Sequence, residues 1–159
     1  MVNRPREIGT AAETAVVKIL RDYFPDADRS PLRGNRDQRD IRGTGDFIWE
    51  VKAGAVARGR AGLAETAAGN VTEWLRQTEQ ERIHAGSRFS VLVTVRAGVG
   101  PKNARRWWAW LHTAAFADIM GAPGHQNATP LRLELGALLD ILADQGLTPD
   151  VAEETAAVA

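Results

Sequence analysis

The chain is predicted to form an α/β domain in which helices flank a mixed central β-sheet. Three observations indicate this class: helical periodicity in the first 24 residues, period-two alternation near residue 50, and a nearly continuous apolar run at 89–95. At 159 residues the chain suits one domain with a sizeable core. We expect that domain over residues 1–145, followed by an acidic and poorly ordered tail over 146–159.

The first expected elements are a helix and a hairpin. Apolar residues at helical spacing predict a helix over 9–24, in which Thr10 and Glu13 form a capping box. A β-hairpin is expected over 38–53, because apolar residues alternate through its second arm and Thr44-Gly45-Asp46 supplies turn residues.

The second half of the chain is expected to complete the sheet. A helix opens near Asn70 and is ended by Gly86. Strands follow at 89–95 and 105–111, then helices at 114–120, capped by Thr113, and at 131–142. In the second of these strands, alternation puts Trp108 and Trp110 on one side and Trp107 on the other.

Composition excludes several kinds of site and address. The chain has no cysteine, which excludes a disulfide scaffold, a thiolate zinc site and a cysteine nucleophile. Its histidines show no metal-ligand spacing. No run approaches the ~18 apolar residues of a membrane-spanning helix, and the first residues lack a signal-peptide core. We therefore expect a cytoplasmic protein without membrane contact.

The formal net charge of zero conceals an uneven distribution. Residues 1–128 carry a net charge of +5, and residues 129–159 carry −5. The segment 29–60 alone carries +4. Because binding to phosphates depends on local basic residues, neutrality does not exclude a nucleic-acid partner. It predicts one basic face and an acidic C-terminal segment kept away from it.

The predicted hairpin carries an unusual set of charged residues. Glu50 and Lys52 are two apart on one strand, so both side chains project from the same face. A three-residue turn places Asp40 across from Glu50, with Cβ atoms roughly 4.5–5.5 Å apart, whereas a two-residue turn sends Asp40 to the other face. Two carboxylates this close repel unless a cation lies between them. Oxygen ligands favour Mg²⁺, and Lys52 could stabilise charge developing on a phosphate.

These residues resemble a known family. Asp40, followed by Glu50-Val51-Lys52, looks like the D…ExK signature of the PD-(D/E)XK nuclease superfamily. The helix containing Gly9-x-x-x-Glu13 is similar to one in its archaeal-type Holliday junction resolvase branch. Two further parts of the chain resemble short resolvase-like nucleases of actinobacteriophages. One is the segment 33–41, and the other is the later pattern of Trp74, Gln77, Glu79, Gly86, the valine strand and Trp107-Trp108. The likeness covers residues 6–120, although Arg39 stands where the superfamily's name has proline.

The resemblance implies a restriction-endonuclease-like core and a Mg²⁺-dependent DNA endonuclease, with Mn²⁺ as a substitute. It further implies a homodimer that acts on branched DNA as a Holliday junction resolvase. The apolar surfaces of Trp107 and of the helix at 114–120 are candidates for the dimer interface. Two alternatives stay open: an endonuclease or nickase on linear duplex DNA, and a catalytically inactive DNA-binding module.

Individual roles are also carried over from the resemblance. Asp40 and Glu50 would bind the metal together with the Val51 carbonyl, and Lys52 would be the catalytic lysine. Glu13 would be an accessory acid and further metal ligand, unless it serves only the capping box. Gln77 would match a glutamine on the following helix, a role for which Gln80 competes.

Four arginines near the hairpin form a candidate DNA-binding strip, namely Arg33, Arg36, Arg39 and Arg42. The alternative is a solvated loop with local ion pairs to Asp28 and Asp37. Likewise, Glu50 and Lys52 could belong to an exposed strand face that does no chemistry.

Overall fold

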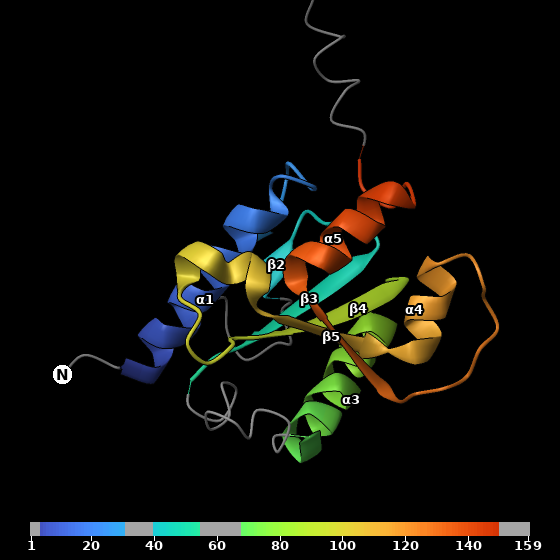
Figure 1. Cartoon of the computed structure of the whole chain (residues 1–159), viewed down its shortest axis with the longest axis horizontal. Helices are drawn as coiled ribbons and strands as arrows, with labels where there is room; N and C mark the ends of the chain where they lie inside the picture. Colours follow the sequence, from blue (N-terminus) through green and yellow to red (C-terminus); the bar gives the residue numbers. More distant parts are fainter. Residues whose placement is uncertain (1–3, 31–39, 55–67, 150–159) are drawn as a thin grey trace, which may run out of the picture.

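A mixed four-stranded β-sheet forms the centre of the computed structural model, which describes residues 4–30, 40–54 and 68–149. The strand order is β3-β4-β5-β6 (Figure 1). β3 and β4 are parallel, and the pairs β4–β5 and β5–β6 are antiparallel. The strands are β3 (Phe47–Lys52), β4 (Phe89–Thr94), β5 (Trp108–His112) and β6 (Pro130–Glu134).

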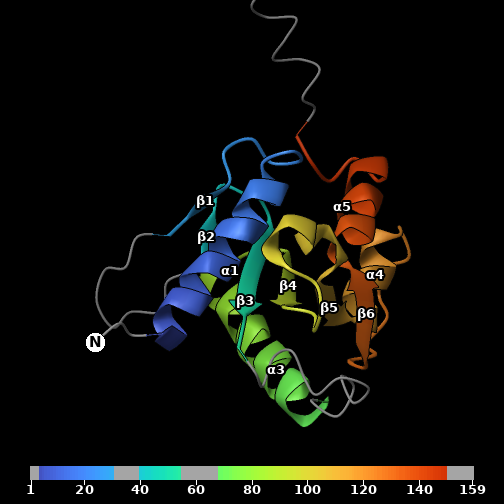
Figure 2. The same ribbon diagram turned by 60° about the vertical axis from the view of Figure 1, so that its left-hand side comes forward.

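Helices cover both faces of this sheet, which confirms the predicted α/β class. Figures 1 and 2 show α1, η2 and α5 on one side of the sheet and α3 on the other. The helices are α1 (Arg4–Leu20), α3 (Ala68–Ala85), α4 (Thr113–Ile119), α5 (Leu135–Asp144) and the 3-10 helix η2 (Pro101–Arg106). No helix in the described part of the chain has the length and apolar character needed to cross a membrane.

The main core lies between the sheet and the layer of α1, η2 and α5. Phe47, Trp49 and Val51 point into it from β3, as the period-two pattern predicts. The Phe47 ring stacks on Phe89, with centroids 5.0 Å apart. Burying each such side chain contributes about 1.5–3 kcal/mol, so this face fixes the position of β3. Glu50 and Lys52 are thereby directed to the opposite face.

A smaller apolar cluster attaches α3 to that opposite face. Val71 and Leu75 of α3 pack with Leu92 of β4, flanked by Trp74 and Trp110. Gly86 ends the helix with a positive φ of 64°, a conformation that favours glycine. The predicted helix between Asn70 and Gly86 is therefore confirmed.

The predicted hairpin is wrong in its pairing. β3 pairs with β4 through the α3 crossover, whereas β2 (Ile41–Arg42) pairs with β1 (Asp28–Arg29) in a separate two-stranded sheet. β4, with all six residues buried, occupies one edge of β3. β3 is the terminal strand of its sheet, and at its other edge the Val51 N–H bonds to the Asp40 side chain instead of to a paired backbone. The polar segment before Gly43 offers no comparable apolar surface.

The first and the last of the predicted helices also differ from the structure. The first helix spans Arg4–Leu20, so Thr10 and Glu13 lie inside it and the capping-box interpretation is wrong. The helix expected over 131–142 is a strand followed by α5, because Leu131 and Leu133 pair with β5. Trp107 is buried, with its indole N–H donating to the Val99 carbonyl, so it offers no surface to a second subunit.

Candidate functional site

Asp40, Glu50 and Lys52 come together at the carboxyl end of β3. The Val51 N–H donates a hydrogen bond to Asp40 Oδ2 at 3.0 Å, although β2 and β3 belong to different sheets. On the neighbouring residues of β3, Lys52 Nζ lies 2.6 Å from Glu50 Oε1. Asp40 lies beside Glu50, as the sequence predicts, but no hairpin places it there. It is the residue before β2, at the edge of the small sheet.

Crowding of the two carboxyl groups changes the chemistry of Asp40. Burial, and next the negative charge of Glu50, raise the pKa of Asp40 to about 7. The hydrogen bond from the Val51 N–H and the charge of Lys52 oppose this rise and do not cancel it. A carboxyl group with such a pKa lies in a site where added positive charge is strongly favoured.

Lys52 is held as a cation by its acidic surroundings. Burial alone would lower its pKa, but the carboxylates of Glu50, Asp40 and Glu81 outweigh burial and raise it. Its side chain keeps 31% of its surface exposed, so the ammonium group also reaches solvent. Lys52 is therefore available to an anionic ligand at neutral pH.

Glu13 lies near Asp40 but already has a partner, Arg29. Its Oε2 accepts a hydrogen bond from Arg29 Nε at 2.9 Å. Burial raises the pKa of Glu13, with the Asp40 charge acting in the same direction and Arg29 opposing. Glu13 can thus contribute negative charge to the site, and the Arg29 guanidinium limits its freedom to bind a cation.

The helix after the motif contributes a different residue from the one expected. Gln77 is exposed, and its amide donates to Glu73 Oε1 at 3.2 Å; Gln80 is also exposed. Glu81, one turn beyond Gln77 on the same side of α3, acts electrostatically on Lys52 and has one buried carboxylate oxygen. Sequence analysis missed Glu81. The only signal for it is its spacing of four residues from Gln77.

Of the four candidate DNA-binding arginines, only Arg42 is among the residues that the structure describes. Arg33, Arg36 and Arg39 lie outside the described residues. Arg42 is exposed and forms an ion pair with Asp28, with Nη2 and Oδ2 3.2 Å apart. The Arg42 hydrogen bond lowers the pKa of Asp28. For Arg42, the structure shows the local ion pair considered as the alternative.

The donor atoms of the site suit a hard divalent cation. Carboxylate oxygens and backbone carbonyls are the ligands that Mg²⁺ takes, usually with several waters. The close approach of Asp40 and Glu50 is the kind of crowding that such a cation relieves. Among the described residues, no group of three or more His, Cys, Asp or Glu side chains is arranged to hold a metal ion. The fit therefore rests on two carboxylates.

Comparisons with known proteins add no relative: no family model matches the chain, and neither a curated protein nor a solved structure shows significant similarity to it.

Proposed function

We propose that the protein is a Mg²⁺-dependent DNA endonuclease of the PD-(D/E)XK type. The observation that carries the proposal is the meeting of Asp40 with Glu50 and Lys52 at the end of β3. The D…ExK pattern alone occurs often by chance, but here it coincides with a half-buried carboxyl pair beside a lysine. The parallel β3–α3–β4 unit and the preceding α1 supply rigid support for these side chains.

Each side chain then has a distinct task. Asp40 and Glu50 would hold the cation with the Val51 carbonyl, and the Val51 N–H keeps Asp40 oriented. When bound, the cation would polarise a phosphoryl oxygen and lower the pKa of a coordinated water. Lys52 would place its ammonium group against the negative charge that develops on the phosphorus oxygens. The negative charges of Glu50, Asp40 and Glu81 raise the pKa of Lys52 and so favour its charged form over the neutral amine.

The proposal extends to branched DNA and to a homodimer through the sequence resemblance to junction resolvases. Two symmetric cuts in a four-way junction need two copies of the site, because one copy contains a single D…ExK set. α4 and the following Met120, which is exposed, are the described surface that we assign to this dimer.

Cleavage of three substrates tests the activity. A four-way junction, a linear duplex and a single strand of matched sequence are incubated with Mg²⁺, Mn²⁺ or EDTA. We expect metal-dependent cleavage of the junction and at least about a 100-fold loss of rate in Asp40→Asn and Lys52→Ala. Asp46→Asn, an exposed carboxylate on the same stretch of chain, is the control and keeps its rate. Equal rates in all variants would refute the site, and preference for the linear duplex would replace the junction substrate.

A second candidate function is an inactive DNA-binding module. It is favoured by the Lys52–Glu50 ion pair, which already satisfies one carboxylate without metal. DNA binding without cleavage in either metal would select this function.

A further inference from the structure

The first turns of α1 extend beyond the core. Val16 and Leu20 lie on the core-facing side of this helix and are buried. The same side continues toward the N-terminus through Glu13, Gly9 and Arg6, because these residues follow at spacings of three and four. Exposure rises along this line, since Glu13 and Gly9 are half-buried and Arg6 is exposed. The inner side of α1 therefore emerges from the core as the helix approaches its N-terminus.

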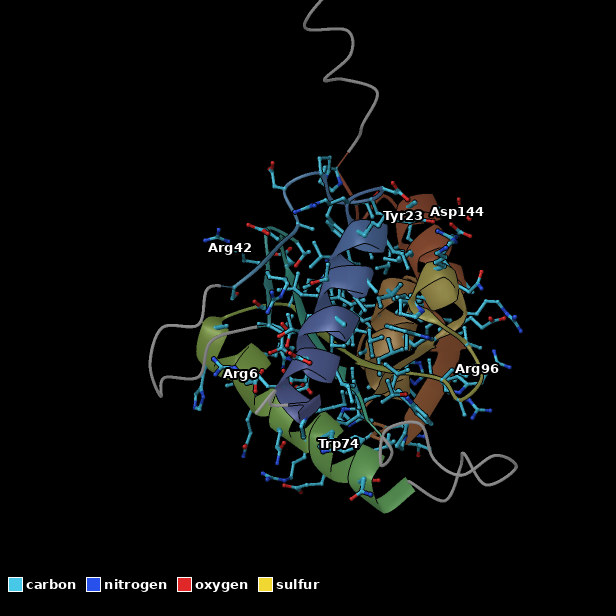
Figure 3. The ribbon with its side chains drawn as sticks, turned by 90° about the vertical axis from the view of Figure 1, so that its left-hand side faces the viewer. Arg6, Tyr23, Arg42, Trp74, Arg96 and Asp144 are labelled. Carbon is cyan, nitrogen blue, oxygen red and sulfur yellow. The ribbon has the colours of Figure 1, made fainter. Side chains whose placement is uncertain are left out.

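This emerging part of α1 is continuous with the candidate active site. Glu13 and Asp40 lie close enough for their charges to interact. Arg6 comes seven residues before Glu13, so the two residues lie about 20° apart around the helix and about 10 Å apart along it. In Figure 3, Arg6 lies on the same side of α1 as Arg42, which follows Asp40 by two residues, whereas Arg96 lies on the other side. A separation of about 10 Å corresponds to about three nucleotides of one DNA strand.

Arg6 has no partner within the described part of the chain. It forms no hydrogen bond or ion pair there, unlike Arg29, whose guanidinium group is held by Glu13. The adjacent carboxylate, Glu7, lies about 100° further around the helix, and neighbouring helical residues do not face each other. The positive end of the helix dipole lies in the same turns. The N–H groups of Arg6 are therefore available to an anionic ligand.

Gly9 is an interior helix residue that the described fold does not require to be glycine. Glycine inside a helix lowers stability relative to alanine, because it loses more backbone entropy on folding. Gly9 does not have a positive φ, and a Cβ atom there would meet no described atom within 4 Å. Glycine is also used where a ligand approaches the backbone closely. The open space over Gly9, one turn from the Arg6 guanidinium group, fits such an approach.

We propose that the inner side of the first turns of α1 binds the sugar-phosphate backbone of the DNA strand next to the cut. Arg6 contacts a phosphate, and Gly9 lets the strand pass close to the helix. This inference rests on the proposed nuclease function for the location of the cut, whereas the binding itself can be measured without cleavage. The contacts involve backbone charge and shape, so they carry affinity rather than sequence specificity.

DNA binding by the full chain in EDTA tests the contact made by Arg6. Fluorescence anisotropy of a labelled four-way junction is recorded across a salt series for wild type and Arg6→Gln. We expect Arg6→Gln to weaken binding about 3- to 10-fold and to lower the slope of log Kd against log salt by nearly one. Lys18→Gln is the matched control, because it removes one charge from an exposed position of the same helix, about 120° around the axis from Arg6. Its affinity should stay within about twofold of wild type.

Substitutions of Gly9 test the close approach through opposite effects on stability and binding. Gly9→Ala should raise the Tm by about 2–4 °C, because alanine favours the helix and its Cβ has free space. Gly9→Leu should weaken junction binding about 5-fold or more, because its side chain occupies the path of the strand. Ala11→Leu adds a similar side chain on the exposed side of α1 and should bind within about twofold of wild type. Thermal unfolding of every variant checks that folding is intact.

Three results would overturn the inference: unchanged affinity and salt slope in Arg6→Gln, an equal loss of affinity in Lys18→Gln, or wild-type binding by Gly9→Leu. A lower Tm in Gly9→Ala would also contradict it, since the fold itself would then require the glycine. Failure of the nuclease proposal looks different. In that case no DNA is cut in Mg²⁺ or Mn²⁺, yet the Arg6 and Gly9 variants still lose DNA affinity.

Discussion

The ionisation of one half-buried side chain, Asp40, opposes folding. Its carboxyl group is held against Glu50 by the Val51 N–H, and its pKa rises to about 7. Charging this group in the folded protein is unfavourable because burial and Glu50 both oppose it. Such strain is typical of functional sites, where charge is arranged for a ligand rather than for the empty fold.

We predict that Asp40→Asn stabilises the metal-free protein. The folded pKa of about 7 exceeds the unfolded value of 3.8, so the folded state binds more protons between these values. The wild type therefore loses stability as pH rises from about 4 to 7, and the loss is complete above pH 7. The amide cannot ionise, so in EDTA at pH 8 we expect a gain of about 1–3 kcal/mol.

Thermal unfolding in EDTA at pH 5 and pH 8 measures this effect. The Tm difference between Asp40→Asn and wild type should be larger at pH 8 than at pH 5. Asp46→Asn, whose side chain is exposed in the turn before β3, should show no such difference. A lower Tm for Asp40→Asn at pH 8 would mean that Asp40 stabilises the empty fold.

At the scale of elements, Gly43 positions the segment that carries Asp40. It has a φ of 78°, and a Cβ atom there would lie 2.0 Å from the Asp26 carbonyl oxygen. Gly45 also has a positive φ, 57°, but its Cβ would meet nothing within 4 Å. Substituting Gly45 therefore tests the cost of a positive φ alone, whereas substituting Gly43 tests that cost together with the clash against the Asp26 backbone.

We predict that Gly43→Ala is much more damaging than Gly45→Ala. Gly45→Ala carries only the conformational penalty, about 1 kcal/mol, whereas Gly43→Ala must also displace the Asp26 backbone and should cost more than about 2 kcal/mol. Denaturant unfolding of both variants gives the comparison. Because β2 begins directly after Asp40, Gly43→Ala should also reduce cleavage. Equal losses of stability would show that the Asp26 contact relaxes freely.

Local patterns predicted the elements better than their pairing. Alternation identified β3, and the valine-rich run identified β4, because each pattern depends only on which faces are buried. Pairing depends on segments that are distant in the sequence: β3 pairs with β4 across the α3 crossover, and β2 pairs with β1 rather than with β3. The single helix predicted over 131–142 was wrong because the leucines change their spacing within it. Leu131 and Leu133 have the two-residue spacing of strand β6, whereas Leu135, Leu138 and Leu139 have the spacing of helix α5.

In the candidate site, too, the features set by local spacing could be predicted and those set by tertiary packing could not. The common face of Glu50 and Lys52 follows from the two-residue period of a strand, so the sequence predicts it directly. Glu81 could not be predicted, because its direction depends on how Val71 and Leu75 rotate α3 against the sheet.

For the whole molecule, we predict that the proposed cation site couples metal binding to folding. The unfolded chain does not hold Asp40 and Glu50 together, so we expect a divalent cation at the proposed site to bind the folded state preferentially and to stabilise it by mass action. At a Mg²⁺ or Mn²⁺ concentration one hundred times the Kd, the expected gain is about 2.7 kcal/mol. For a domain of this size, that corresponds to a rise in Tm of roughly 5–10 °C.

Thermal unfolding with increasing Mn²⁺ or Mg²⁺ at constant ionic strength measures this coupling. The wild-type Tm should rise with metal concentration, and the rise should disappear in Asp40→Asn, although the same substitution stabilises the empty protein. Glu73→Gln, an exposed carboxylate on α3 paired with Arg76, is the control and should respond like wild type. Opposite effects of one substitution in the absence and presence of metal separate a cation site from a simple ion pair with Lys52. If metal raises the Tm of wild type and Asp40→Asn equally, the cation binds elsewhere and the carboxylates serve only the lysine.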